Sequence, residues 1–230
     1  MANLFPEMNF KTGTTGTFTP IILTTAFFFR HVNELKNKNI TIIPNYVNTE
    51  VFKPSSEKKK QIVFAGRLHW SKGIDVLIDA FKKFSKTKPE YKLFILGIGE
   101  EETKLKQFAA NHPDIIFTGG LPNNEVAKLF NESEIFVLPT INMEGHPKAL
   151  VEAMASGCKC IASDVPGNNH VLIESNSKEF LFKSKDSNDL YEKLVLVSNT
   201  QSSNQYDYAL KNYSANVCFQ REIEVLMKKE

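Results

Sequence analysis

The 230-residue sequence is poor in cysteine, and its three cysteines form no CxxC pair. Cys158 and Cys160 lie close together along the chain, and Cys218 is far from both. An odd number of loosely spaced cysteines indicates reduced thiols, as in a cytosolic protein, and not a disulfide framework. No cluster of histidine and cysteine has the spacing of metal ligands, so we expect no metal site.

The sequence also lacks an excess of charge of one sign and a long apolar run. A net charge of +2 and a pI of about 8.3 give little support to nucleic-acid binding, which needs a clustered basic face. Residues 1–20 lack a secretory signal. The apolar run at residues 21–29 is too short to span a bilayer and predicts a buried strand or helix. We expect a cytoplasmic protein whose exposed lysines fit weak peripheral association with an anionic inner membrane face.

From residue 40 onward, two kinds of segment alternate. Short runs rich in Ile, Val and Phe end at Gly, Pro or Ser, which is typical of strands buried on both faces. The amphipathic stretches between them predict helices. This alternation predicts an α/β fold with a doubly wound, Rossmann-like parallel sheet. The expected strands are 40–43, 61–66, 92–97, 114–119, 134–139, 159–163 and 179–182, and the expected helices are 73–86, 100–112, 124–133 and 187–198.

The two ends of the chain depart from this alternation. Residues 1–39 show no clear βα repeat and are too short for a second domain of similar size, so they form an N-terminal extension. Residues 40–200 form the expected Rossmann-like domain. Residues 201–230 begin in a polar loop and predict one long C-terminal helix.

Two cations follow the second expected strand. Arg67 and Lys72 lie between the strand at 61–66 and the helix at 73–86, where doubly wound sheets bind their ligands. A guanidinium grips phosphate oxygens with two donors and an ammonium sits beside them as a point charge, so this pair suits a diphosphate. Spacing alone leaves open a second interpretation, a solvated lysine and an arginine paired with a nearby acid.

The stretch EGHPKALVEAMASG at residues 144–157 places two carboxylates around a helix start. Pro147 suits the first helical turn, and the unpaired amides after it would form an anion site at the positive end of the helix. Glu144 would lie at the mouth of that site, and Glu152 could accept hydrogen bonds from a vicinal diol such as ribose. Alternatively, Glu144 favours the helix dipole and Glu152 is exposed, although its apolar neighbours indicate a buried carboxylate that needs a partner. The expected amides are those of Lys148, Ala149 and Leu150.

The remaining strand-end loops carry weaker signals. Gly97 and Gly99 lack the third glycine of a dinucleotide fingerprint and predict a tight turn. Further glycines would allow a ligand to approach the backbone closely, and they are Gly119, Gly120 and Gly167. Three histidines in these loops are expected to be packing or surface residues rather than catalysts, and they are His69, His146 and His170.

Several motifs occur together and in a fixed order, at residues 42–54, 64–81, 93–105, 115–130 and 136–167. With Tyr213-Ser214 near the C-terminus, they resemble the C-terminal, donor-binding half of a GT-B glycosyltransferase of the retaining family 4 type, also described as glycosyl transferases group 1. Glu144 and Glu152 match the E-x7-E pattern of that family. The resemblance implies a single GT-B C-terminal domain, with residues 1–39 as the last piece of an acceptor-binding domain that is otherwise missing.

The resemblance also implies an activity and a site. The reaction would transfer a sugar, with retained configuration, from a nucleotide-diphosphate sugar to a glycan or lipid-linked acceptor. Arg67 and Lys72 would bind the diphosphate, Glu152 the ribose and Glu144 the sugar hydroxyls, and no metal or other cofactor would be needed because the cations and the helix dipole stabilise the leaving group. The implied catalytic residues are Glu144, Lys72 and Arg67. The implied donor contacts are Gly66, Arg67, Lys72, Gly119, Leu121, Glu144, Gly145, His146, Pro147, Lys148, Ala149, Leu150 and Glu152.

The chain departs from the family pattern at several positions. Asn45-Tyr46 replaces the usual Asn-Gly, His146 stands where an aromatic residue is common, and Lys148 where a smaller or neutral residue is usual. The run at 168–170 replaces part of a Gly-Gly-x-x-Glu motif, and Ala215 replaces a Trp. These departures leave the sugar and acceptor contacts undefined.

Two other functions stay open at this point. One is a non-catalytic nucleotide-sugar-binding or pairing subunit of a split transferase, and the other is a nucleotide-sugar epimerase of the same fold. The E-x7-E pattern and the loop at 67–73 favour transfer over epimerisation. A separate chain could supply the N-terminal acceptor domain. The sequence names neither the base nor the sugar of the donor.

Overall fold

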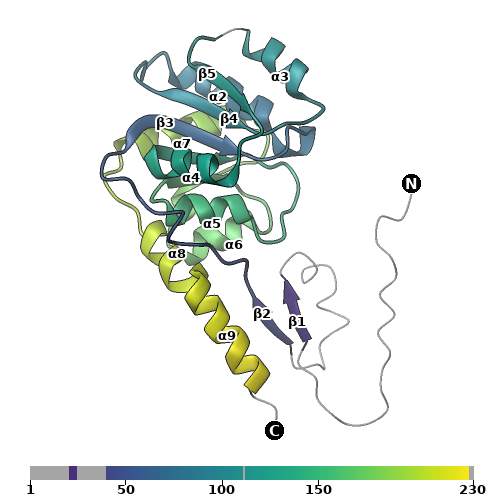
Figure 1. Ribbon diagram of the computed structural model, residues 1–230. Helices are drawn as coiled ribbons and strands as arrows, with labels where there is room; N and C mark the ends of the chain where they lie inside the picture. The colour runs from purple at the N-terminus through teal and green to yellow at the C-terminus, as the bar shows by residue number, and fades with distance from the viewer. Residues whose placement is uncertain (1–20, 25–39, 111, 228–230) are drawn as a thin grey trace, which may run out of the picture.

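A computed structural model describes residues 21–24, 40–110 and 112–227, and its main body is built on one parallel sheet (Figure 1). The strand order is β5-β4-β3-β6-β7-β8, and every neighbouring pair is parallel. This confirms the predicted doubly wound, Rossmann-like sheet. The strands are β3 (Lys59–Ala65), β4 (Lys92–Leu96), β5 (Ile115–Gly119), β6 (Ser133–Leu138), β7 (Lys159–Ser163) and β8 (Leu181–Phe182).

Helices cover both faces of the sheet. On one face α2 packs against α3 and α7, and on the other α4 packs against α5. The central strands are consequently buried on both faces, and Ile62, Val63 and Phe64 of β3 are fully inaccessible. The helices are α2 (Ile74–Phe84), α3 (Glu102–Ala109), α4 (Asn123–Glu132), α5 (Lys148–Ala155), α6 (Asn168–Glu174) and α7 (Ser187–Asn199).

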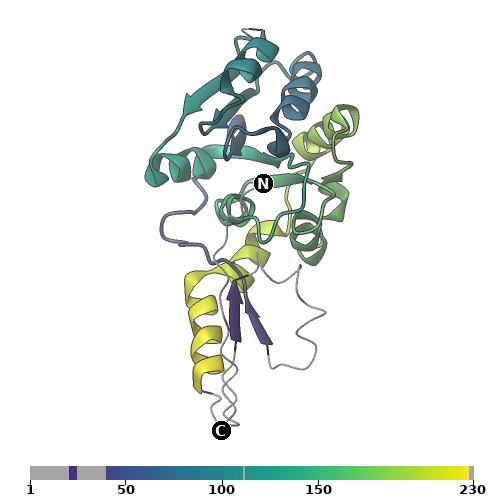
Figure 2. The ribbon, with the colours of Figure 1, turned by 90° about the vertical axis from the view of Figure 1, so that its right-hand side faces the viewer.

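Residues 40–43 form a strand as predicted, but not in the main sheet. This strand, β2 (Ile40–Ile43), pairs in parallel with β1 (Ile21–Thr24) in a separate two-stranded ladder. The ladder projects from the body, and residues 25–29 of the predicted apolar run lie outside the described residues (Figure 2). The alternation of strand and helix therefore begins only with β3, because no helix of the described residues connects β2 to it.

Two further local predictions were wrong. The segment at 163–170, expected to be a loop, already contains the start of α6 at Asn168, after a turn in which Gly167 has φ 94°. The expected strand at 179–182 is reduced to the two residues of β8, because a 3₁₀ helix, η3 (Lys178–Phe180), precedes it. A strand this short leaves most of the edge of β7 without a strand partner.

The C-terminal segment is two helices rather than one. α8 (Gln205–Tyr213) and α9 (Ala215–Met227) are separated by Ser214, whose extended backbone interrupts the helix. The break has a cause, because the Val47 amide donates to the Tyr213 carbonyl and the Ala215 amide donates to the Val47 carbonyl. These two bonds replace helical ones and direct α9 away from the body, beside the β1–β2 ladder (Figure 2).

A buried glutamine attaches α8 to the sheet. The side-chain amide of Gln205, which is fully inaccessible, accepts from the Cys160 amide at 2.7 Å and donates to the Cys160 carbonyl at 2.9 Å. Because β8 pairs only with Ala162 and Ser163, Gln205 takes the place of a neighbouring strand at this position of β7.

Replacing this glutamine tests that attachment. Gln205→Leu leaves a buried N–H and a buried C=O of β7 unpaired, and each such group costs about 1–3 kcal/mol. We expect the free energy of unfolding to fall by about 2–4 kcal/mol in urea denaturation. Gln107→Leu, at an exposed position of α3, serves as the matched control and should change it by less than about 0.5 kcal/mol. Equal effects of the two substitutions would contradict the proposed attachment.

Candidate active site

Two loops lie at the point where the order of the strands in the sheet reverses, between β3 and β6. From β3 the chain winds outward to β4 and β5, and from β6 it winds the opposite way to β7 and β8. The loops that follow β3 and β6 therefore diverge from neighbouring strands and leave a crevice between them, which is where open α/β sheets bind ligands. Arg67 and Lys72 lie in the first loop, and Glu144 lies in the second.

A glycine and a backbone bond hold these two loops in close contact. Gly73 has φ 62°, and a Cβ atom at this position would lie 2.2 Å from the Pro139 carbonyl oxygen, so a side chain would force the loops apart. Beside it, the Ile141 amide donates to the Ser71 carbonyl at 2.8 Å. The ends of both loops are thus fixed to each other before any ligand is present.

The central contact of the site is an ion pair between the loops. Nζ of Lys72 donates to Oε1 of Glu144 at 2.5 Å, and the Thr140 hydroxyl donates to the same oxygen at 3.0 Å. Both charged side chains are about three-quarters buried, so water screens their attraction less than on an open surface. Lys72 and Glu144, which were both expected to contact the donor, contact each other here, and Thr140 is a third member that the sequence did not single out.

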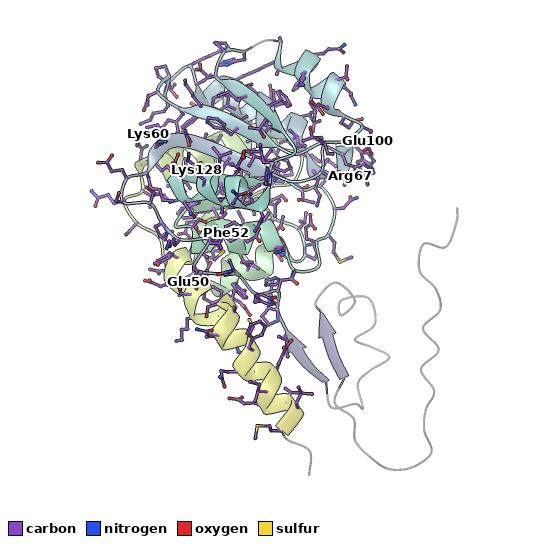
Figure 3. The ribbon with its side chains drawn as sticks, viewed as in Figure 1. Glu50, Phe52, Lys60, Arg67, Glu100 and Lys128 are labelled. Atoms are coloured by element: carbon purple, nitrogen blue, oxygen red, sulfur yellow. The ribbon has the colours of Figure 1, made fainter. Side chains whose placement is uncertain are left out.

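Arg67 points to a different acid. It donates to Oε2 of Glu100 at 3.1 Å, and the two side chains lie together at one edge of the body (Figure 3). His69 also approaches Glu100, with Nε2 3.4 Å from Oε1. The pKa of the Glu100 carboxyl is lowered, first by its own backbone N–H and then by Arg67. The pairing of Arg67 with a nearby acid, left open above, thus occurs in the ligand-free chain.

The start of α5 supplies free amides, although one fewer than expected. The helix begins at Lys148, with Pro147 in the preceding capping position. The Leu150 amide donates to the Pro147 carbonyl at 3.0 Å, so it is already used and the expectation that it is free was wrong. Within the described part of the chain, the amides of Lys148 and Ala149 have no hydrogen-bond acceptor, and they point out of the positive end of the helix.

Glu152 is buried one turn into α5, with 8% of its surface exposed. Burial raises the pKa of its carboxyl, and the ammonium of Lys148, 3.5 Å away, opposes that shift. Lys148 is therefore the partner that a carboxylate in this apolar helix requires. The exposed-surface alternative for Glu152 is wrong, and a polar ligand could take over the contact made by the more exposed Lys148.

Contacts from two other parts of the chain fix the backbone at Glu144 and His146. Gly167, with φ 94°, packs so closely that a Cβ atom there would lie 2.3 Å from the Glu144 carbonyl oxygen, and the Glu144 amide donates to the Pro166 carbonyl. On the other side, Nδ2 of Asn45 donates to the His146 carbonyl at 2.9 Å. Asn45 belongs to a dipeptide that differs from the family pattern, and its side chain positions the backbone at His146.

The side chain of His146 is buried behind this turn, against Tyr213. Its ring meets the Tyr213 ring edge-on at a centroid distance of 4.9 Å, and neither ring nitrogen has a hydrogen-bond partner among the described residues. Burial lowers the pKa of His146 to about 4, with a smaller contribution from His170. The imidazole is consequently neutral near pH 7 and acts as a packing group, as expected for the loop histidines.

A hollow of about 670 Å³ opens beside Arg67, at the ends of β3, β4 and β5. Gly66, Arg67 and Leu121, three of the predicted donor contacts, line it together with Gly120, whereas Gly119 does not. Lys72 and Glu152 do not line this hollow either. The structure therefore joins Lys72 to Glu144 and Glu152 to Lys148, and it places Arg67 in the lining of a neighbouring hollow.

The described residues contain no group of three or more His, Cys, Asp or Glu side chains placed to hold a metal ion. The metal-independent reaction stays a prediction. Cys158, Cys160 and Cys218 are buried and free. No helix in the described part of the chain is both long and apolar enough to cross a bilayer.

Comparison with known proteins connects this arrangement to a family. The family model described as "Glycosyl transferases group 1" matches residues 20–214. An uncharacterised glycosyltransferase of Haemophilus influenzae is 31% identical over 72% of this chain and 47% of its own length. The putative colanic acid biosynthesis glycosyltransferase WcaL of Escherichia coli is 29% identical over 60% of this chain and 36% of its own length. The chain thus spans half or less of the curated relatives it matches.

Solved structures show the same fold. The pneumococcal O-GlcNAc transferase GtfA, in complex with UDP and GlcNAc, superimposes with a TM-score of 0.73 at 22% identity, covering 90% of this chain and 45% of that protein. The C-terminal domain of a group 1 glycosyl transferase (LpcC) from Francisella tularensis gives 0.65 at 23% identity, covering 74% of this chain and 99% of that domain. The smaller domain thus leaves about a quarter of the chain unmatched.

The buried imidazole of His146 makes the stability of the fold depend on pH. His146 has a folded-state pKa of about 4 against about 6.5 when unfolded, so the unfolded chain binds more protons between these values. Stability should therefore fall as the pH decreases from about 6.5 to 4, by about 3 kcal/mol from this residue alone. His146→Phe removes this titration, so the free energy of unfolding of the variant in urea denaturation should rise relative to that of the wild type as the pH falls across that window. Parallel stability curves would show that the imidazole is not buried.

Proposed function

Because the chain belongs to the family of group 1 glycosyl transferases, we propose that it carries the donor-binding half of an enzyme that transfers a sugar from a nucleoside-diphosphate sugar to a glycan or lipid-linked acceptor. The observation that carries this proposal is the Lys72–Glu144 pair, which lies at the sheet reversal next to the open amides of α5. Retention of configuration rests on the family resemblance.

When the donor binds, the cations of the site exchange carboxylate partners for the phosphate oxygens of the donor. In the ligand-free chain Arg67, Lys72 and Lys148 each contact a carboxylate. A diphosphate offers the same cations an anion that several donors can share, so Lys72 can move from Glu144 to a phosphate oxygen. That move frees Glu144 to accept hydrogen bonds from the hydroxyls of the transferred sugar.

The amides of Lys148 and Ala149 then complete the anion site. They are fixed donors at the positive end of α5, and they need no rearrangement when charge develops on the leaving diphosphate. Together with Lys72 they stabilise that charge more in the transition state than in the bound donor, which is how electrostatic preorganisation accelerates a reaction. Glu152 is the acceptor for a ribose diol, and the hollow beside Arg67 and Leu121 is large enough for the base.

The acceptor-binding half of the enzyme would lie against the part of the chain that projects from the body. Four large apolar side chains are exposed along one side of α9, next to the β1–β2 ladder. They are Phe219, Ile223, Leu226 and Met227. An exposed stripe of this kind marks an interface.

Nucleotide titration tests the donor site. We expect one of UDP, GDP and ADP to bind in calorimetry, and Lys72→Met and Arg67→Met each to weaken that binding about 10- to 100-fold, because each removes a charge-assisted contact of about 1.5–3 kcal/mol. Glu144→Gln should weaken binding of the sugar nucleotide by a smaller factor. Lys86→Met, at an exposed position after α2, is the control and should bind normally. Absence of binding by all three nucleotides would favour a pure pairing subunit.

Addition of the second half tests the transfer reaction. Residues 1–230 alone should bind donor with little transfer, because transfer needs a second half that positions the acceptor and excludes water. Adding a candidate acceptor-binding chain should produce labelled glycan, and Ile223→Asp with Leu226→Asp should abolish this gain without changing donor affinity. Gln220→Asp, exposed on the same helix, is the matched control. A gain that survives the double substitution would place the interface elsewhere.

A further inference from the structure

The single tryptophan of the sequence lies in the loop that carries the donor-site cations. Trp70 begins a short 3₁₀ helix, η2 (Trp70–Lys72), and 55% of its surface is exposed. A single exposed apolar residue is ordinary. Trp70, however, stands at the wall of a hollow rather than on an open surface, and it lies only two residues before Lys72.

This second hollow has a volume of about 290 Å³ and lies between η2, the start of α2, and α3. The buried side chains of Ile74 and Leu105 form part of its lining. Trp70 and Phe108, both substantially exposed, also line it. Its volume is at the lower end of the roughly 300–1,000 Å³ usual for small-molecule sites, so it suits one ring rather than a whole nucleotide.

Apart from His69, the remaining lining of this hollow is charged. Asp75, Glu101 and Lys104 contribute two carboxylates and one ammonium, and Lys104 contacts Glu101 at 3.0 Å. A phosphate would meet two carboxylates here, and an apolar side chain would strip water from all three charges without replacing its hydrogen bonds. The hollow needs a ligand that packs on aromatic rings and also hydrogen-bonds to charged groups. A pyranose ring does both, since its C–H face packs on an aromatic ring and its hydroxyls hydrogen-bond to carboxylates and ammonium groups.

We propose that the hollow at Trp70 binds one pyranose unit of the acceptor glycan. The inference rests on the proposed transferase function and adds an acceptor subsite on the donor-binding half itself. Chain geometry keeps the Cα atoms of Trp70 and Lys72 within about 7 Å of each other. His69 connects the two regions, with its ring 5.2 Å from the Trp70 ring and its Nε2 3.4 Å from Glu100, the partner of Arg67.

Trp70 provides its own test, because it is the only tryptophan that can fluoresce. Maltotriose, cellotriose and triacetylchitotriose are titrated into the full chain while tryptophan emission is recorded, with glycerol at equal mass concentration as the control. We expect at least one trisaccharide to give a saturable blue shift with a Kd on the order of millimolar, as befits a single stacked ring. Unsaturable changes identical to those in glycerol would overturn the proposal.

Variants show whether the hollow itself is the site. Phe108→Ala removes one of the aromatic side chains that line the hollow, so the Kd obtained from the saccharide-induced emission shift should rise at least five-fold. Lys128→Ala, at an exposed position of α4 that does not line the hollow, should leave the shift unchanged. Circular dichroism of both variants establishes that they fold. An unchanged saccharide response in folded Phe108→Ala would overturn the assignment.

Nucleotide binding distinguishes failure of this inference from failure of the proposed function. UDP, GDP and ADP are titrated calorimetrically into the same wild-type and Phe108→Ala proteins, which should bind them equally. Nucleotide binding without any saccharide response would overturn only the acceptor subsite. Saccharide binding without nucleotide binding would retain the hollow as a sugar site and remove the transferase interpretation on which its role as an acceptor subsite depends.

Discussion

The site depends on one constraint, the contact between the loops that leave β3 and β6. These strands are neighbours in the sheet, but their chains wind in opposite directions, so the loops would separate without a direct connection. Gly73 allows the backbones to touch, and the ion pair of Lys72 with Glu144 crosses the crevice between them. Removing either feature would alter the distance between the cations and the amides of α5, on which the proposed recognition of a diphosphate depends.

Much of the sheet could be predicted from the sequence because its strands are continuous apolar runs with clear ends. The same patterns placed Arg67, Lys72 and Glu144 at strand ends, and the structure brings two of these three into contact. The partner of Arg67 could not be predicted, because Glu100 follows a different strand and only the strand order makes them neighbours. The same limit applies to Lys148, whose pairing with Glu152 depends on how deeply the helix is buried.

The errors occurred where tertiary contacts override local preference. The C-terminal segment has the composition of one helix, yet hydrogen bonds to Val47, far away in sequence, break it at Ser214. The strand at 40–43 has the same apolar character as the strands of the main sheet, and no local signal shows that it pairs with residues 21–24 instead. Gln205 was likewise missed, because only the shortness of β8 creates the vacancy that its side chain fills.

The joint at Val47 has a mechanical consequence. The ladder strand β2 leads into it, α9 departs from it, and both therefore turn about the same few residues. Asn45 and Tyr213, which flank this pivot, both contact His146, since Asn45 donates to the His146 carbonyl and the Tyr213 ring packs on the imidazole. Rotation of α9 and β2 about Val47 would therefore move Asn45 and Tyr213, and with them the backbone at His146 beside the proposed phosphate site.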